Sequence, residues 1–436
     1  MMEEVFAACR EHLDCNFVEQ FQTTGFDARL FELFLFAYFK SIGADVERAA
    51  ERPDYLVCRN GTTVAVEATT ANPTQRPGET PKLITGVDLR ALVDEDEQAR
   101  VERSQQELPI RLGSALYSKL NKRYWKLPHV KGRALVLAIQ PFYSHDSLLF
   151  SSAGIAQYLY GIRQTGRHDE QGKLVIDTAE VEEHQLAEKK IPSNFFAQPE
   201  TEHISAVLYT NVAAVSKFTR MGYQAGLHRG NVLVSRRGAA WDPDPNAKEA
   251  AQFSYRLDED PGPEPWGSGV EVFLNPRALH SLPEFFFDDA IQTSLKDGVP
   301  VSLLKQFVPF VSITQRLTLK LDSLAPVEDR RGHVGTILRR EFDAFQPKRP
   351  PYKSGEVPFS EVAWFADAER RLIGTVFRWH GQERYGVAIL GPDEAGRWRA
   401  IDTAGDVSSL DVAAKVAIAR MQQIVGTGET VFPQGD

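Results

Sequence analysis

Residues 53–70 read PDYLVCRNGTTVAVEATT, and this stretch decides the fold. Two runs rich in β-branched and apolar residues, 54–58 and 63–69, flank the dipeptide Asn60-Gly61. Asn-Gly between such runs is a strong signal for a tight hairpin. The sequence therefore predicts two antiparallel strands joined by a two-residue turn.

Helices are predicted on both sides of this hairpin. Residues 26–42 have the pattern of a helix, with Asp27 as the candidate N-cap and Gly43 as the C-terminal stop. A second helix is expected at about 111–126, and the apolar run ALVLAI at 134–139 has the composition of a buried strand. The order helix, two strands, helix, strand predicts a mixed α/β layer.

Composition along the chain predicts three parts. Residues 1–345 would form the main domain with insertions, among them a polar stretch at 166–202 that is expected to be a loop. Residues 346–358, QPKRPPYKSGEVP, are rich in proline and charge and have the composition of a linker. Residues 359–436 would form a small α+β accessory domain.

The whole chain has the composition of an ordinary globular protein. Among its 436 residues are three scattered cysteines, too few for a disulfide framework and without zinc spacing. The first residues lack the pattern of a signal peptide, and no apolar stretch is long enough to span a membrane, so a cytoplasmic protein is expected. The net charge of −9 argues against indiscriminate coating of nucleic acid but leaves room for a local basic groove.

Glu32 is the only polar residue in the run LFELFLFAYF at 30–39. A helix with so many apolar residues buries most of its circumference. A carboxylate buried there needs a compensating partner. A metal ion is one such partner, and a basic side chain of the protein is the other.

Asp54 and Glu67 add two more acids on adjacent strands of the hairpin. Glu67 stands within the β-branched run TVAVEATT, where an acid is poorly tolerated without a purpose. Two acids on neighbouring strands and one on a packed helix, Glu32, can converge on a divalent cation. Mg²⁺ or Mn²⁺ held in this way would activate water for attack on a phosphate.

At these residues the sequence resembles the restriction-endonuclease-like PD-(D/E)XK nuclease superfamily. The motif is carried by Pro53-Asp54 and by Glu67-x-Thr69, with Glu32 on the preceding helix. Stretches such as FELFLFAYFK, RPDYLV and VAVEATTANP also resemble an uncharacterised group of bacterial proteins. The resemblance implies a mixed sheet flanked by helices, a Mg²⁺ or Mn²⁺ cofactor, and the hydrolysis of phosphodiester bonds.

Thr69 departs from the superfamily pattern, which has a lysine at this position. In that superfamily the helix after the Glu-x-Lys strand runs next to the active site. Lys119, on the helix predicted at 111–126, is therefore the candidate for a relocated lysine.

The stretch from 109 to 133 contains seven Lys and Arg residues and no acid. On a helix, five of them fall within one arc, and apolar residues fall on another face. Such a stripe could neutralise phosphates, although a solvated basic face is the plain alternative. The five candidates for nucleic-acid binding are Arg111, Lys119, Lys122, Arg123 and Lys126. Tyr124 falls on the apolar face, where packing accounts for it.

The function expected from these patterns is that of a magnesium-dependent endonuclease acting on DNA, with a role in restriction or anti-phage defence implied by the resemblance. The alternative is a catalytically inactive nuclease-like fold that binds nucleic acid or a partner protein, and Thr69 favours it. A partner protein or a homo-oligomer is compatible with either. Elsewhere, KFTRMG at 217–222 carries two cations and could contact a phosphate, but a loop or helix end is the simpler interpretation.

Overall fold

The hairpin predicted from residues 53–70 is present at the start of a large sheet. Strand β2 (Tyr55–Arg59) and strand β3 (Thr62–Ala71) pair antiparallel. Asn60 (φ 52°) and Gly61 (φ 74°) connect them in the left-handed conformation that a two-residue hairpin requires. The prediction of this hairpin is confirmed.

The computed structural model describes residues 1–13, 16–23, 25–47, 52–73, 97–227, 232–259, 262, 264–304, 307–318, 359–367, 372–379, 384–392 and 398–427. The chain divides into two compact units. One consists of Met1–Leu227 with Val234–Gln315, and the other of His228–Leu233 with Arg316–Asp436. The linker predicted at 346–358 lies outside the described residues.

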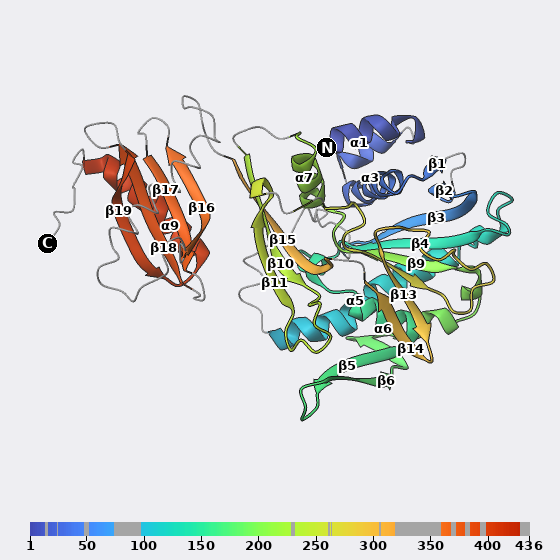
Figure 1. The fold of residues 1–436 in the computed structure, drawn as a ribbon. Coiled ribbons are helices and arrows are strands. Elements are labelled where there is room, and N and C mark those ends of the chain that lie inside the picture. The colour runs from blue at the N-terminus through green and yellow to red at the C-terminus, as the bar shows by residue number, and fades with distance from the viewer. Residues whose placement is uncertain are drawn as a thin grey trace. The chain divides into compact units, whose positions relative to one another are not determined.

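The first unit contains a mixed sheet of eight strands with helices on its faces (Figure 1). In sheet order the strands are β1 (Asp45–Glu47), β2, β3, β4 (Ala134–Pro141), β9 (Ala206–Thr210), β12 (Val270–Leu274), β13 (Ile291–Lys296) and β14 (Val299–Leu303). The pairs β3–β4, β4–β9 and β12–β13 are parallel, and the other neighbours are antiparallel. The predicted mixed α/β layer is confirmed, as is the buried strand ALVLAI, which forms most of β4.

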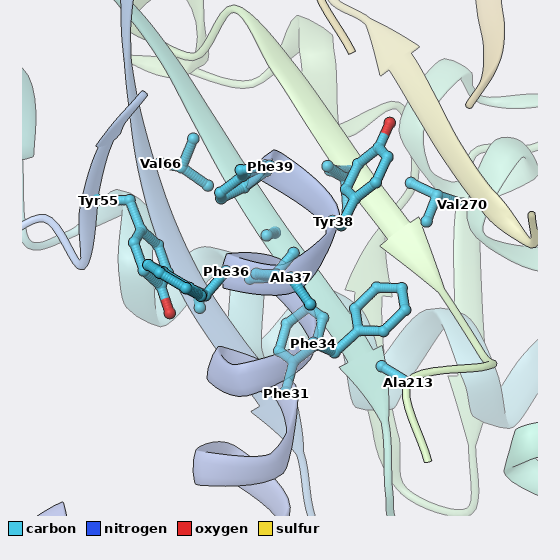
Figure 2. Packing of buried hydrophobic residues seen from close by; sticks show 14 of the residues in the cluster. Phe31, Phe34, Phe36, Ala37, Tyr38, Phe39, Tyr55, Val66, Ala213 and Val270 are labelled. Carbon is cyan, nitrogen blue, oxygen red and sulfur yellow. The ribbon is translucent and has the colours of Figure 1, made fainter. Parts of the chain in front are cut away.

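Helix α3 covers one face of this sheet and spans Phe26–Ser41, as predicted for 26–42. Its aromatic side chains pack against Tyr55 and Val66 of the hairpin (Figure 2). Gly43, with φ 74°, follows its C-terminus, as expected. The N-cap position is held by Gly25, so the prediction of Asp27 as the N-cap is wrong, and Asp27 is buried in the first turn.

Further helices of the first unit are α1 (Met2–Cys9), α2 (Phe17–Phe21), α5 (Glu97–Leu120), α6 (Ala153–Tyr160) and α7 (Val215–Gln224). Helix α5 packs on the face of the sheet opposite α3, where Leu112 and Leu116 share a core with Leu135 and Leu137 of β4. The helix predicted at 111–126 is therefore wrong at both ends. It begins earlier, continues through Pro109, and ends at Leu120.

Smaller sheets are formed mainly by residues of the first unit. A three-stranded sheet has the order β11 (Ala251–Arg256), β10 (Val232–Ala240) and β15 (Pro309–Thr318). Two hairpins, β5 (Ile162–His168) with β6 (Leu174–Glu180) and β7 (Glu183–Leu186) with β8 (Lys189–Pro192), occupy most of the stretch 166–202. The prediction of an inserted loop there is wrong. These strands are polar and largely exposed, so apolar periodicity does not mark them.

The second unit contains an antiparallel sheet with one packed helix. Its strands are β16 (Phe359–Asp367), β17 (Leu372–Trp379), β18 (Tyr385–Pro392) and β19 (Trp398–Val407). Helix α9 (Leu410–Thr427) buries Ala413, Ala417 and Met421 against this sheet. Across the described parts of both units, no helix is long and apolar enough to cross a membrane.

Candidate functional site

Asp54 and Glu67 lie beside each other across the hairpin. The strands pair with Tyr55 opposite Val66, so the residue before Tyr55 lies next to the residue after Val66. The main-chain N–H of Asp54 donates to Glu67 Oε2 at 3.3 Å, and Asp54 Oδ2 accepts from the main-chain N–H of Ala68 at 2.7 Å. The hairpin itself therefore holds the two carboxylates together.

Glu67 receives two further donors on its other oxygen. Lys119 Nζ, from the last turn of α5, lies 2.6 Å from Glu67 Oε1, and Tyr124 OH donates to the same atom at 2.7 Å. Glu67 is only 5% exposed, whereas 24% of the Lys119 side chain is exposed. Solvent therefore reaches this cluster at Lys119. We call Asp54, Glu67, Lys119 and Tyr124 the acid-pair site.

The electrostatics of the acid-pair site disfavour two negative charges. The pKa of Asp54 is raised to about 7, first because the carboxyl is buried and then because Glu67 and Glu32 are negatively charged neighbours. The hydrogen bond from Ala68 and the charge of Lys119 oppose this shift without cancelling it. Around neutral pH the site is therefore short of positive charge, and a divalent cation is a group that would supply it.

Glu32 does not join Asp54 and Glu67 in one ligand group. Both of its carboxylate oxygens accept from Arg29 Nη1 at 2.9 Å. Its helix α3 packs on the face of the sheet that carries Val66, whereas alternation along the strand turns Glu67 to the other face. In the described part of the chain, no three His, Cys, Asp or Glu side chains are grouped as metal ligands. The three acids are therefore not grouped as ligands of one ion among the described residues, and Glu32 has the basic partner that was its alternative, although its charge still raises the pKa of Asp54.

Lys119 reaches the place predicted for a relocated lysine. Thr69 is two residues after Glu67, so its side chain lies on the same face of β3, where it is partly exposed. The ammonium that contacts Glu67 comes instead from α5, the next helix after this strand in the described part of the chain. The position of Lys119 beside the acids is thus confirmed, and its role in catalysis stays a prediction.

The other basic residues of 109–133 do not form one helical stripe, because α5 ends at Leu120. Arg123 has a left-handed backbone (φ 54°), and a 3₁₀ turn follows at Tyr124–Lys126. Arg111 pairs with Glu107 on its own helix, and Arg123 pairs with Glu200 at 2.9 Å. Lys122 and Lys126 are exposed. The prediction that five cations lie along one helix is therefore wrong, and their binding of nucleic acid stays a prediction.

Tyr124 is a site residue that the sequence pattern assigned to packing. Its ring is buried with the core under α5, yet its hydroxyl reaches Glu67. Burial raises the pKa of this hydroxyl, and the Glu67 hydrogen bond raises it further, so it remains a donor. Close by, His129 Nε2 lies 2.6 Å from Arg52 O, directly before Pro53-Asp54. No spacing rule in the sequence marks either contact.

No family model, curated protein or solved structure matches this chain. Two adjacent carboxylates with a deficit of positive charge can hold a cation, and Mg²⁺ is commonly bound through one or two carboxylates while it keeps several waters. Lys119 and Tyr124 hold the orientation of Glu67. The site therefore has the donor set for an ion bound by two acids.

Proposed function

We propose that the protein is a metal-dependent nuclease of restriction-endonuclease-like fold that hydrolyses phosphodiester bonds of DNA. Asp54 and Glu67 would hold Mg²⁺ or Mn²⁺. The observation that carries the proposal is the contact of Lys119 Nζ with Glu67 Oε1 at 2.6 Å. It supplies, from helix α5, the cation that the acid-x-lysine motif lacks at Thr69.

The order of elements around the acids supports the same proposal. An apolar helix (α3), an antiparallel acid-bearing hairpin (β2–β3), a helix (α5) and a parallel strand (β4) follow one another in the chain. This is the order that the resemblance to PD-(D/E)XK nucleases implies. A divalent ion at such a site activates a water and stabilises the negative charge that develops on the phosphate.

Each residue of the acid-pair site has a distinct task in this proposal. Glu67 and Asp54 would hold the cation through their carboxylates, while the hydrogen bond from Tyr124 orients Glu67 through Oε1. Lys119 is 24% exposed at its side chain, so its ammonium can contact both Glu67 and a phosphate oxygen of the substrate. The exposed Lys122 and Lys126 would bind the phosphate backbone next to it.

A plasmid-cleavage assay with Mg²⁺ and with Mn²⁺ tests the proposal. We expect nicking by the wild type and a loss of about 100-fold or more in Asp54→Asn and in Glu67→Gln. Asp45→Asn is the matched control, because Asp45 is an exposed acid on the neighbouring strand β1. Single-stranded DNA and RNA are parallel substrates. Equal nicking by all four proteins would identify a contaminant and refute the proposal.

Lys119→Met tests the relocated lysine separately. The expected loss is about 100- to 1000-fold, the size found when one charge-stabilising donor is removed from an active site. Lys40→Met is the control, since Lys40 is an exposed lysine at the end of α3. Full activity of Lys119→Met would remove this residue from the mechanism while leaving the metal ligands in place.

The second candidate function is a catalytically inactive fold that binds nucleic acid or a partner protein. The Arg29–Glu32 pair favours it, because it leaves two acids where three were expected. A gel-shift assay on the same proteins separates the candidates. Retention of DNA by wild type and Asp54→Asn alike, without cleavage by either under any metal, is the result expected of the inactive fold.

A further inference from the structure

A second group of charged side chains, which shares no residue with the acid-pair site, comes from α7, β10 and the segment between β11 and β12. Figure 1 labels α7 and β10. The group consists of Lys217, Arg220, Arg236 and Glu264, and we call it the buried cationic cluster. Their side chains are 0%, 3%, 1% and 9% exposed, respectively. Lys217 and Arg220 belong to KFTRMG, which forms part of helix α7, so its prediction as a loop or a helix end is wrong.

The carboxylate of Glu264 forms ion pairs with all three cations of this cluster. Lys217 Nζ lies 2.6 Å from Glu264 Oε1, and Arg220 contacts both carboxylate oxygens at 2.7 and 3.0 Å. Arg236 Nη1 lies 3.3 Å from Glu264 Oε2. Among the described residues, no second acid forms an ion pair with these cations. The group therefore carries more positive than negative charge in a place from which water is nearly excluded.

The excess of positive charge affects the titration of the cluster. The pKa of Lys217 is lowered to about 7, mainly by burial and also by the charges of Arg220 and Arg236, although Glu264 opposes the shift. Burial alone would raise the pKa of Glu264, but Lys217 and Arg220 more than offset it and hold the pKa well below its usual range. Uncompensated buried charge is costly, so a further anion would stabilise the cluster.

Besides Glu264, the cations of the cluster donate to oxygens of neighbouring residues, and Lys217 Nζ contacts the main-chain oxygens of Pro265 at 2.7 Å and of Ser268 at 3.5 Å. Thr314 Oγ1 accepts from Arg220 at 2.6 Å, and Ser312 Oγ and Tyr255 OH accept from Arg236 at 3.1 and 3.3 Å. Each of these hydroxyls keeps its own O–H as a donor. Arg236 Nη2 is buried and has no hydrogen-bond partner among the described residues. A ligand that only accepts hydrogen bonds, and that carries negative charge, is the complement of such a group.

We propose that the buried cationic cluster is a binding site for a phosphate group, and that Glu264 occupies the place of this ligand in the ligand-free protein. Glu264 is the most exposed of the four, so the ligand enters where this carboxylate now lies. Three cations and three hydroxyls then surround a tetrahedral oxyanion that offers acceptors in several directions. The site is independent of the proposed nuclease activity, because it shares no residue with the acid-pair site.

Thermal unfolding with increasing inorganic phosphate, at constant ionic strength and with EDTA present, tests this proposal. EDTA keeps divalent ions out of the acid-pair site. We expect a saturable rise in melting temperature for the wild type and its loss in Lys217→Met. Lys190→Met is the matched control, because Lys190 makes an ion pair of the same 2.6 Å length with Glu183, but at the surface. The control should respond to phosphate as the wild type does.

Two further variants keep the test decisive if Lys217→Met does not fold. Thr314→Val removes one hydroxyl with little change of shape and should weaken phosphate binding several-fold. Glu264→Gln removes the competing charge and should strengthen binding about 10-fold or more. A 5′-mononucleotide in place of inorganic phosphate distinguishes an esterified phosphate from a free one. Stabilisation by both ligands indicates that the site accepts phosphate esters. Stabilisation by inorganic phosphate alone indicates that it binds the free ion.

Three results would overturn the proposal. The first is a stabilisation that chloride produces equally at the same ionic strength. The second is phosphate binding of equal strength in Lys217→Met and wild type, which would place the anion elsewhere. The third is binding by Glu264→Gln without any binding by the wild type, which would make Glu264 a permanent partner and the cluster purely structural.

Discussion

The acid-pair site and the buried cationic cluster are the same kind of arrangement with opposite sign. In the first, Lys119 faces two adjacent carboxylates, and in the second, Glu264 faces three cations. In both sites the single side chain of opposite charge, Lys119 or Glu264, forms a contact of 2.6 Å. In each case the imbalance predicts the sign of the missing partner, a cation at the hairpin and an anion at α7. Replacing single members of each group tests this comparison.

The largest effect on stability is expected from Glu264→Ala. It leaves three buried cations without their common partner, and removal of one member of a buried pair costs about 3–5 kcal/mol. Glu183→Ala breaks an exposed pair of the same length and should cost less than about 1 kcal/mol. Urea unfolding of both variants measures the difference. Equal small losses would mean that the cluster is well hydrated, contrary to the structure.

The pH dependence of stability distinguishes the acid-pair site. Because the pKa of Asp54 is raised from 3.8 to about 7, the folded protein holds this proton when the unfolded chain has lost it. The stabilisation of the folded state by protonated Asp54 is therefore fully present below about pH 4, and it is lost as the pH rises through about 7. The amide introduced by Asp54→Asn does not titrate, so the variant should keep its stability as the pH rises. At pH 8 its free energy of unfolding should exceed that of the wild type by about 2–4 kcal/mol.

Urea unfolding at pH 4 and pH 8 measures this effect as a difference between wild type and variant, so that all other titrating groups cancel. Asp45→Asn, at an exposed position, is expected to follow the wild type at both pH values. If the wild type at pH 8 is as stable as Asp54→Asn or more stable, the pKa of Asp54 is not raised.

Magnesium should act on the same residue. At a concentration of 100 times its dissociation constant, an ion that binds only the folded state stabilises it by about 2.7 kcal/mol. We expect this gain for the wild type at pH 8 and little of it for Asp54→Asn, which has lost one of two ligands. Unfolding with and without Mg²⁺ measures it, and an equal gain in both proteins would place the ion elsewhere.

The smallest effect is expected from Tyr124→Phe. It removes the hydroxyl that donates to Glu67 but leaves Lys119 on the same oxygen, so the cost should be about 1 kcal/mol. Tyr117→Phe, at a tyrosine of α5 that is 52% exposed, is the control and should change little. A loss as large as that of Glu264→Ala would show that Tyr124 supports more than one hydrogen bond.

Local patterns predicted the parts of the fold that local chemistry determines. Asn60-Gly61 fixed the hairpin, and the apolar run of α3 fixed a buried helix, because turn conformation and apolar periodicity are properties of neighbouring residues. The C-terminal end of α5 was missed because the left-handed backbone of Arg123 has no glycine to signal it. The hairpins at 166–202 were missed because exposed polar strands have no apolar alternation.

The site shows the same limit. Asp54 and Glu67 were predicted as neighbours because a hairpin of known turn fixes their register. The partner of Glu32 was left open between a metal ion and an unnamed basic side chain. Arg29 stands three residues before Glu32 on the same helix, the spacing at which side chains meet, and this signal was not used. Glu264 gave no such signal for Lys217 and Arg220, since its distance along the chain exceeds any local pattern.

The two-residue turn at Asn60-Gly61 also bears on the order in which the protein assembles. It brings the first acid to the second across only 13 residues, so the loop that must close is short and its entropic cost small. In the buried cationic cluster, Glu264 contacts Lys217 and Arg220, which are 47 and 44 positions away in the chain. Contacts of low sequence separation form early in folding. The hairpin acids are therefore expected to meet while the α7 cations are still solvated, and burial of those cations becomes a late step of folding.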